Sequence, residues 1–379
     1  MDLLAKSDTR SQGLRVTETN PQTDLKWECL VEEHPNGSIY HHPAWLEALE
    51  GEFGQKGVYL ICVDAADRVL AILPMLYTRG LPFDLGGNLA RRRLSSLPRT
   101  PIAGPLSIDP EATVAVLREA VRRVSQNSGL QLQIKTQGPE LCGLVDGLVC
   151  QPWRQSYVLQ LPHPSKGPYR VPDGQERARI KWAVKKASKL GVTVRPAETE
   201  VDLRHWYGAY LETMRHNMIP PRPFRFFAAL WKTLRPAERM RVLIAEHGEA
   251  SGKKVIAGAV YLMFGRTVSY AYSGMLRQYG SMRANDAIQW HAINEACQTG
   301  FHLFDFGEVP EGHTELAKFK RKWGAEPTRL YRYTTSVPAA PTSGRVDSPY
   351  NVESISQIIW RYVPLKLTEW MGDQIYRRL

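Results

Sequence analysis

In the first half of the chain, the spacing of hydrophobic and polar residues predicts a helix, a pair of strands, a second helix and a further strand. The expected elements are a turn and helix over 38–50, strands over 58–63 and 69–76, a helix over 111–124 and a strand over 130–136. Polar turn residues at 64–68 lie between the two neighbouring strands. This arrangement predicts an antiparallel hairpin.

The second half of the chain repeats that order. The expected elements are helices over 201–216, 223–234 and 284–299, and strands over 240–246, 255–264, 267–274 and 301–306. The two halves share little sequence identity, but both contain a strand, a polar turn and a strand at the same place in the order. The sequence therefore predicts an α/β (α+β) protein of two tandem domains, each with a mixed, mainly antiparallel sheet flanked by helices.

Stretches rich in proline and glycine indicate the boundaries between these parts. One such stretch covers 162–172 and leads into a helix over 175–190, and a second linker covers 336–348. The expected division is an N-terminal domain at 1–161, a linker and helix at 162–191, a C-terminal domain at 192–335, and a linker with an amphipathic helical tail at 336–379.

The 379-residue chain is basic, with a formal net charge of +11 and an isoelectric point near 9.4. An excess of this size favours an anionic partner, such as RNA, a nucleotide-linked or lipid-linked substrate, or a membrane surface. Solubility alone would explain a milder excess.

The cysteines and the apolar runs limit the cellular context. Neither a disulfide framework nor a metal site is expected, because the cysteines form no C-x-x-C pair and no histidine stands at metal-ligand spacing. The N-terminus lacks the apolar core of a signal peptide, and the longest apolar runs are too short to span a bilayer. We expect a cytoplasmic protein, either free or at the inner face of the membrane. The five cysteines are Cys29, Cys62, Cys142, Cys150 and Cys297.

The helix expected over 175–190 has two distinct faces. Arg177, Lys181, Lys185 and Lys189 recur every four residues and form a basic stripe. The opposite stripe is apolar and consists of Ile180, Ala183, Val184 and Ala187. A solvated helix face would explain the basic stripe, but so local an excess of positive charge favours binding of an anion such as a phosphate backbone.

A strand, loop and helix over 270–299 resemble the donor-binding part of GNAT enzymes. In those enzymes a Q/R-x-x-G-x-G/A loop holds the pyrophosphate of coenzyme A with its backbone N–H groups and the following helix N-terminus. Arg277 and Gly280 match the first two fixed positions, with Gln278 in the same candidate donor loop, whereas Met282 stands where a small residue is required. We therefore expect the topology of that region, with acyl-CoA as only one of the possible donors.

A third segment combines a carboxylate with a cluster of lysines. A strand is expected to end on Asp305, a glycine-containing loop leads to Glu308, and a short helix carries Lys320. A carboxylate at a strand end can deprotonate an attacking amine, and a nearby lysine can stabilise the oxyanion that forms. The alternative is a capping aspartate beside solvated lysines. No serine lies in a G-x-S-x-G context, so we expect direct attack on an activated donor without a covalent enzyme intermediate.

Three segments resemble the Fem family of tRNA-dependent peptidyl transferases, which build the interpeptide bridges of peptidoglycan. They are "SIYHHPAWLEAL", "RIKWAVKKASKLGVTV" and "ANDAIQWHAINEACQTGFHLFDFGE", the last followed by "LAKFKRKWGAEP". The tail "IIWRYVPLKLTEWMGDQIYRRL" also resembles Fem-like proteins found with exosortase and exopolysaccharide genes. The resemblance spans roughly residues 38–335 and implies two consecutive GNAT folds.

The resemblance also implies roles for individual residues. Lys320 is expected to stabilise the oxyanion and Phe319 to position the reacting carbonyl. Tyr270 and Tyr272 would line the acceptor cleft, and Arg177 and Arg179 fall near positions that contact acceptor phosphates in some relatives. The coiled-coil arm that some family members use for tRNA is absent from the sequence.

Two enzymatic hypotheses and one non-catalytic hypothesis follow. The first is an aminoacyltransferase that moves an aminoacyl group from aminoacyl-tRNA to an amine of a cell-envelope precursor or amino sugar. The second is an acyl-CoA-dependent N-acyltransferase of exopolysaccharide biosynthesis. Both need only a co-substrate, without a tightly bound cofactor. The third is an RNA- or membrane-binding module, for which the C-terminal segment offers aromatic and basic residues suited to a bilayer surface, although docking onto the protein's own core is the commoner fate of such a helix.

Overall fold

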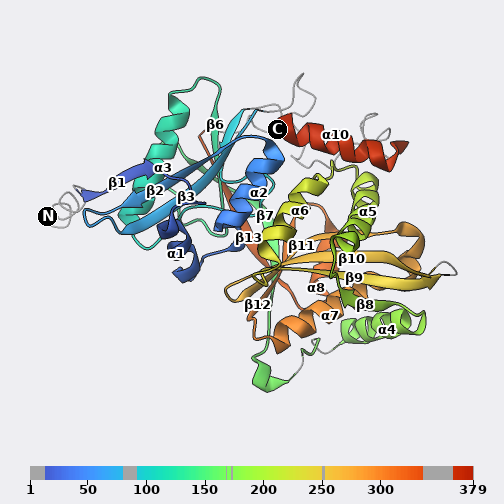
Figure 1. Ribbon diagram of the computed structural model, residues 1–379. Helices are drawn as coiled ribbons and strands as arrows, with labels where there is room; N and C mark the ends of the chain where they lie inside the picture. Colours follow the sequence, from blue (N-terminus) through green and yellow to red (C-terminus); the bar gives the residue numbers. More distant parts are fainter. Residues whose placement is uncertain are drawn as a thin grey trace. The chain divides into compact units, whose positions relative to one another are not determined.

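The computed structural model describes residues 13–79, 92–167, 169–171, 174–249, 252–335 and 362–378 (Figure 1). These residues form two compact units. The first contains the described residues up to Trp153 together with 329–335, and the second contains the described residues of 154–328 together with 362–377. The chain therefore returns to the first unit near its end, whereas the sequence pattern assigned all of 192–335 to the second domain.

The first unit is a mixed sheet with helices. Its strands lie in the order β1-β2-β3-β4-β6-β13, with the short β5 beside β3. Its elements are β1 (Arg15–Glu18), α1 (Leu25–Glu33), the 3-10 turn η2 (Ile39–His41), α2 (Pro43–Phe53), β2 (Gly57–Val63), β3 (Val69–Thr78), β4 (Arg93–Ser95), β5 (Leu106–Ser107), α3 (Pro110–Ser125), β6 (Gln131–Thr136) and β13 (Glu326–Thr334).

The second unit has a sheet in the order β8-β9-β10-β11-β12-β7. Its elements are β7 (Val149–Gln160), the 3-10 turn η5 (Pro164–Lys166), α4 (Gln175–Lys189), β8 (Thr193–Pro196), α5 (Glu200–His216), α6 (Phe224–Leu234), β9 (Met240–Glu249), β10 (Gly252–Phe264), β11 (Thr267–Met275), the 3-10 helix η6 (Arg277–Met282), α7 (Ala284–Gln298), β12 (Leu303–Val309), α8 (Thr314–Arg321) and α10 (Leu365–Arg378).

The two units repeat one topology, which confirms the predicted fold class. Each unit contains, in this order, a strand, two helices and three further strands, and these strands form an antiparallel sheet. A crossover helix then leads to a strand that pairs in parallel. Thus α3 connects β4 to β6 in the first unit, and α7 connects β11 to β12 in the second. Each sheet then gains one antiparallel strand, β13 beside β6 and β7 beside β12.

The predicted hairpins are present, whereas the polar strands β7 and β13 were not predicted. β2 pairs with β3 and β9 with β10, both antiparallel. β7 and β13 were missed because their sequences, VCQPWRQSYVLQ and EPTRLYRYT, contain few aliphatic residues. Residues 80–91 and the linker predicted at 336–348 lie outside the described residues.

Each unit has its own hydrophobic core. In the first, α3 packs Val116, Leu117 and Ala120 against the strands of its sheet. In the second, α7 contributes Ile288 and Ile293 to a cluster that also includes aromatic residues of the sheet. Burial of a valine, leucine or isoleucine side chain contributes about 1.5–3 kcal/mol. The predicted apolar stripe of α4 is confirmed, since Ile180, Ala183 and Ala187 are buried and Val184 packs against the same cluster.

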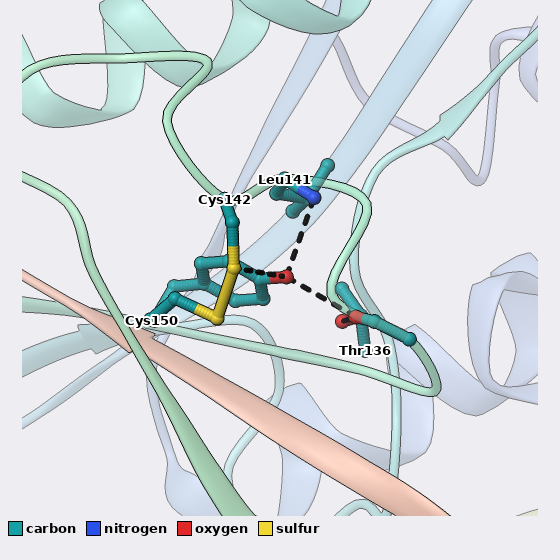
Figure 2. Close-up of a disulfide and its surroundings, with 6 residues drawn as sticks. Thr136, Leu141, Cys142 and Cys150 are labelled. Atoms are coloured by element: carbon teal, nitrogen blue, oxygen red, sulfur yellow. Dashed lines mark hydrogen bonds between the residues drawn. A yellow bond between two sulfur atoms is a disulfide. The ribbon is translucent and has the colours of Figure 1, made fainter.

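Two cysteines form a disulfide, which contradicts the expectation from their spacing. Cys142 and Cys150 are joined, with their Cα atoms 5.6 Å apart (Figure 2). Tyr333 of β13 lies beside them, where its hydroxyl accepts a bond from the Leu141 N–H and donates one to the Gly138 carbonyl. The spacing rule failed because the loop between β6 and β7 folds back and brings two separated cysteines together.

The structure bears on two further expectations. Among the helices described, none combines the length and apolar character needed to cross a bilayer. The C-terminal segment predicted as a helical tail contains α10, and its earlier residues up to 361 lie outside the described part of the chain.

Candidate active site

The acidic residue predicted at a strand end lies inside a strand. β12 runs through Asp305 and continues to Val309, so that expectation is wrong. The register with β7 shifts between Asp305 and Glu308, which indicates a β-bulge. Gly307 stands in the bulge with φ +75°, a conformation that residues with a Cβ rarely adopt. The sequence resembles a turn because a bulge and a turn both require such a glycine.

The bulge lies where two parallel strands stop pairing. β11 and β12 pair at only three positions, the last of which places Ser269 opposite Asp305. β11 continues to Met275, while β12 goes on beside β7 with Glu308 opposite Ser156. The backbone that follows Ser269 and the carboxylate of Asp305 are therefore found together at the end of the parallel pairing.

The Asp305 carboxylate is held through one of its oxygens. The Ser156 hydroxyl donates a 2.9 Å hydrogen bond to Oδ1, and the Gly307 N–H donates a 2.7 Å bond to the same atom. Burial raises the pKa of Asp305 above its ordinary value, and these two bonds and the charge of Lys320 oppose that rise. Among the described residues no hydrogen bond ends on Oδ2, so this oxygen can accept a proton from a substrate.

Lys320 is buried against the bulge. Its Nζ donates to the carbonyl oxygens of Gly307 and Glu308, at 2.8 and 3.0 Å, and the side chain is almost fully buried. Burial lowers the pKa of Lys320 to about 8, and the negative charges of Asp305 and Glu308 oppose that fall. An ammonium has three N–H donors, so one remains after these two bonds. The expectation of a solvated lysine cluster is wrong for Lys320.

The Phe-Lys-x-x-Trp-Gly motif explains how Lys320 is placed. Trp323 is completely buried, and the buried Tyr169 hydroxyl donates to its carbonyl oxygen. Gly324 has φ +83° and turns the chain after α8. Phe319 is half-buried beneath the Lys322 ammonium, 4.5 Å from its ring centre. Anchoring of the tryptophan therefore fixes the helix from which Lys320 projects, while the role of Phe319 stays a prediction.

Glu308 joins the same cluster through its side chain and its backbone. Arg154 of β7 forms an ion pair with Oε1, whereas Oε2 is buried without a hydrogen-bond partner. Sequence reasoning missed Arg154 and Ser156, because they lie about 150 residues before Asp305 and Glu308 on a strand that it did not predict. No local signal in the sequence could have linked them.

The two tyrosines predicted to line one cleft lie in different clusters. The register between β10 and β11 shifts between Tyr270 and Tyr272, so β11 has an additional residue there. Tyr270 packs with Phe306 and Tyr261 in the α7 cluster. Tyr272 instead contacts Tyr210 and aromatic residues of α6, namely Phe226 and Phe227. Only Tyr270 is near the bulge, since a Cβ at Gly307 would lie 3.7 Å from the Tyr270 carbonyl oxygen.

Burial raises the pKa of Tyr270, and hydrogen bonds with Ser273 and Gln289 act against that rise. Gln289 of α7 is buried, and its Oε1 has no hydrogen-bond partner. Tyr270 thus presents a neutral hydroxyl on a half-buried side chain close to the Asp305 bulge.

The predicted donor loop is a short helix. Residues Arg277–Met282 form η6, and the Tyr279 N–H donates to the Leu276 carbonyl. The Arg277 N–H donates a 2.8 Å bond to the carboxylate of Glu212 on α5. Gln278 is exposed and Gly280 half-buried. The expected strand and helix flank the loop, but a carboxylate of the chain itself already occupies its first N–H group.

The basic helix α4 packs on the second unit beside the start of α7. Lys181 and Lys185 are exposed, and Arg179 forms an ion pair with Glu176 at 2.6 Å. In the described part of the chain, neither Lys181 nor Lys185 forms a hydrogen bond or ion pair with Asp305, Glu308 or Lys320. Their substrate contact therefore stays a prediction, as does that of Arg177.

Sequence reasoning overlooked Trp182 of α4, which is 54% exposed. The cations of Lys186 and Arg283 lie 5.1 and 5.3 Å from its ring centres. The basic helix α4 and the residue before α7 are therefore joined by a cation–π interaction at Trp182.

One group of side chains in the described residues could present three atoms to a metal ion. It consists of Glu28, Glu32 and His42, in the first unit. The His42 Nε2 lies 3.3 Å from Glu28, a geometry that an ordinary histidine–carboxylate pair also has. The prediction that no metal is bound stays a prediction.

Comparison with known proteins identifies the class of the second unit. Residues 174–321, from the start of α4 to the end of α8, match the acetyltransferase (GNAT) domain family. This part of the chain is a GNAT domain, and the predicted membership of the GNAT superfamily and the predicted acyltransferase class are confirmed at that level. A search of curated protein sequences finds no match.

Solved structures show that the fold extends over both units. FemX is 13% identical, with a TM-score of 0.64 over 85% of this chain and 97% of the FemX chain. The C-terminal domain of a putative lysylphosphatidylglycerol synthetase from Agrobacterium fabrum gives 12% and 0.54, and L-PGS from Bacillus licheniformis gives 13% and 0.52, each over 84% of this chain and 92% of the other. The predicted Fem-like tandem fold is therefore confirmed as a fold.

Proposed function

We propose that the protein transfers an acyl group directly from an activated donor to a primary amine, with its chemistry at the β12 bulge. One observation carries the proposal. In a GNAT domain, a half-buried Asp305 with a raised pKa stands at the end of the parallel β11–β12 pairing, beside a buried Lys320. One of its oxygens accepts no hydrogen bond from the described residues. A general base and a cation close together are what amine acylation requires.

In the proposed reaction, the amine nitrogen attacks the carbonyl carbon of the donor. Asp305 Oδ2 accepts the proton that the amine releases, and the third N–H of Lys320 donates to the oxyanion. Collapse of the tetrahedral species breaks the carbon–oxygen bond of an ester or the carbon–sulfur bond of a thioester. The leaving group then takes the proton from Asp305, which restores the carboxylate.

Aminoacyl-tRNA is the proposed donor. The observation that favours it is the hydrogen bond from the Arg277 N–H to Glu212. The Glu212 carboxylate occupies an N–H group of the loop that would otherwise bind the pyrophosphate of coenzyme A, and its negative charge would repel that pyrophosphate. The exposed lysines of α4 provide positive charge for a phosphate backbone. Acyl-CoA is the second candidate, favoured by the match to the acetyltransferase (GNAT) domain family.

The proposed acceptor is an amine of an anionic cell-envelope precursor or an amino sugar, used at the inner face of the membrane. The net charge of +11 supports an anionic acceptor. Structures with this fold include FemX, the C-terminal domain of a putative lysylphosphatidylglycerol synthetase, and L-PGS. In the second hypothesis, the acceptor is an amino sugar destined for an exopolysaccharide.

The test is a radiolabel-transfer assay with the purified full chain. Mixed aminoacyl-tRNAs and acetyl-CoA, each labelled in the acyl group, are offered separately with amine-bearing nucleotide-linked and lipid-linked sugars. We expect transfer from tRNA that disappears in Asp305→Asn. Transfer from acetyl-CoA alone would replace the first donor with the second, and no transfer from either donor would refute the proposed chemistry.

A further inference from the structure

We propose that the outer face of α10 docks on an anionic lipid bilayer. This inference rests on the C-terminal helix alone and is independent of the proposed acyl transfer. The sequence indicated two fates for this segment, namely contact with a membrane or docking onto the protein's own core. The structure of α10 allows both, because opposite faces of the helix have different surroundings.

The inner face of α10 is fixed to the second unit. Thr368 and Tyr376 are buried, and a Cβ at Gly372 would lie only 2.5 Å from the Pro221 carbonyl oxygen. Asp373 forms an ion pair with Arg225 of α6, and the Arg215 guanidinium donates to the Val363 carbonyl at 3.2 Å. Contacts along the whole helix therefore hold it against α5 and α6, and a fixed helix presents its outer face in one orientation (Figure 1).

The outer face exposes large apolar side chains. Trp370 is 60% exposed and Leu367 is 44% exposed, and Tyr362, just before the helix, is 82% exposed. Positions 367 and 370 are three residues apart, so their side chains are neighbours on one helical face. Tryptophan and tyrosine favour the boundary between water and lipid, because they combine an apolar ring with a polar group, and leucine favours the acyl region.

The charges on this face favour an anionic surface. The exposed charged residues of the described part of α10 are Lys366 and Arg377, and no carboxylate is exposed there. The two acidic residues of the helix, Glu369 and Asp373, are half-buried, and Asp373 pairs with Arg225 and Arg377. Basic residues beside exposed aromatic ones on an otherwise anchored helix are typical of an interfacial membrane contact.

The size of the patch argues against a protein partner. A stable protein interface buries about 800 Å² on each side and uses some 20–30 residues. Three exposed apolar side chains beside two cations fall well short of that, whereas a bilayer needs only insertion of a few side chains at its surface.

The test is flotation of the full-length protein with lipid vesicles. Vesicles of phosphatidylglycerol and phosphatidylcholine are compared with vesicles of phosphatidylcholine alone. We expect the wild type to float with the anionic vesicles, and the double variant Leu367→Ser/Trp370→Ser to have a partition coefficient at least about tenfold lower. Lys366→Glu is expected to weaken binding to anionic vesicles and to leave the weak binding to neutral vesicles unchanged.

The matched control is Ile108→Ser/Val201→Ser, which removes two apolar side chains, each 60% exposed, from other surfaces. It is expected to float like the wild type. Equal flotation of wild type and Leu367→Ser/Trp370→Ser, or equal loss in the control, would overturn the proposal. So would a wild type that stays with neither vesicle and forms a dimer that the double variant abolishes in sedimentation velocity. An unchanged thermal midpoint shows that the double variant is folded.

Discussion

The two units share one topology, but only the second has a carboxylate at the end of its parallel strand pair. In the first unit the last paired position of β4 and β6 joins Ser95 to Gln133, and in the second the corresponding position joins Ser269 to Asp305. The amide of Gln133 cannot act as a base, whereas the carboxylate of Asp305 can. The proposed chemistry therefore depends on one position in one copy of the repeated fold.

Each unit also has a buried lysine near this position, and the two lysines contact different groups. In the first unit, Lys135 Nζ donates to the carbonyls of Leu97 and Thr100, in the loop that follows β4. In the second, Lys320 Nζ comes from α8 and donates to carbonyls of the bulge next to Asp305. The first lysine ties a loop to the sheet, and the second brings a cation to a carboxylate. The two units thus provide matched controls for each other.

The largest expected effect is that of Asp305→Asn. The amide keeps an oxygen that can accept the bonds from Ser156 and Gly307, but it cannot accept a proton from the amine. We expect kcat to fall by about 10²–10⁴-fold with little change in thermal stability, measured by radiolabel transfer and calorimetry. Gln133→Asn, at the equivalent position of the first unit, should leave kcat within about twofold. A comparable loss in Gln133→Asn would remove the distinction between the units.

Lys320→Met should affect both activity and stability. It leaves two carbonyls of the bulge without their donor and removes the cation, so we expect a destabilisation of about 2–4 kcal/mol and a loss of about 10²–10³-fold in kcat. Lys135→Met should destabilise by a similar amount in chemical denaturation while kcat is retained. If both variants lost activity in parallel with stability, Lys320 would have only a structural role.

The pH dependence of kcat/KM should have two limbs. Activity rises as Asp305 loses its proton, at a pH above the ordinary carboxyl range, and falls near pH 8 as Lys320 loses its own. In Lys320→Arg the cation persists, so the alkaline limb should move upward. An unchanged alkaline limb in that variant would assign it to another group.

The same lysine should make stability depend on pH. The pKa of Lys320 is about 8 in the folded protein, whereas a solvent-exposed lysine, as in the unfolded chain, has a pKa of 10.5. The unfolded chain therefore binds more protons between these values, and stability relative to Lys320→Met should rise from pH 8 to 10.5. Urea denaturation at several pH values measures this difference, and a fall across that range would contradict it.

The smallest expected effect concerns Cys142→Ser in the first unit. The disulfide closes a loop with a sequence separation of 8, and a loop of this size predicts a loss of about 2–3 kcal/mol under oxidising conditions. With reductant present, wild type and variant should unfold at nearly the same denaturant concentration, and kcat should be unchanged in both conditions. A loss of kcat would link this loop to catalysis.

Much of the fold could be predicted from the sequence. The hairpins β2–β3 and β9–β10 and the crossover helices α3 and α7 follow from hydrophobic period and turn residues, which are local properties. Strands β7 and β13 could not be predicted, because their polar residues are stabilised by neighbours that arrive from distant parts of the chain.

The candidate site divides in the same way. Its types of residue, a carboxylate and a lysine on a strand–helix segment, could be identified locally together with Trp323 and Gly324. Three features were beyond that reasoning, namely the bulge at Gly307, the separation of Tyr270 from Tyr272, and the partners Ser156 and Glu212.

By itself, the sequence determined the order of elements, the repeat and the chemical groups available, since these depend on short-range pattern and composition. Only the tertiary structure decided which oxygen of Asp305 accepts hydrogen bonds from Ser156 and Gly307, and that Lys320 is buried with a lowered pKa. The reason is physical. Desolvation, and the direction of a hydrogen bond, depend on which residues surround a group in space, and those residues lie on strands far apart in the chain.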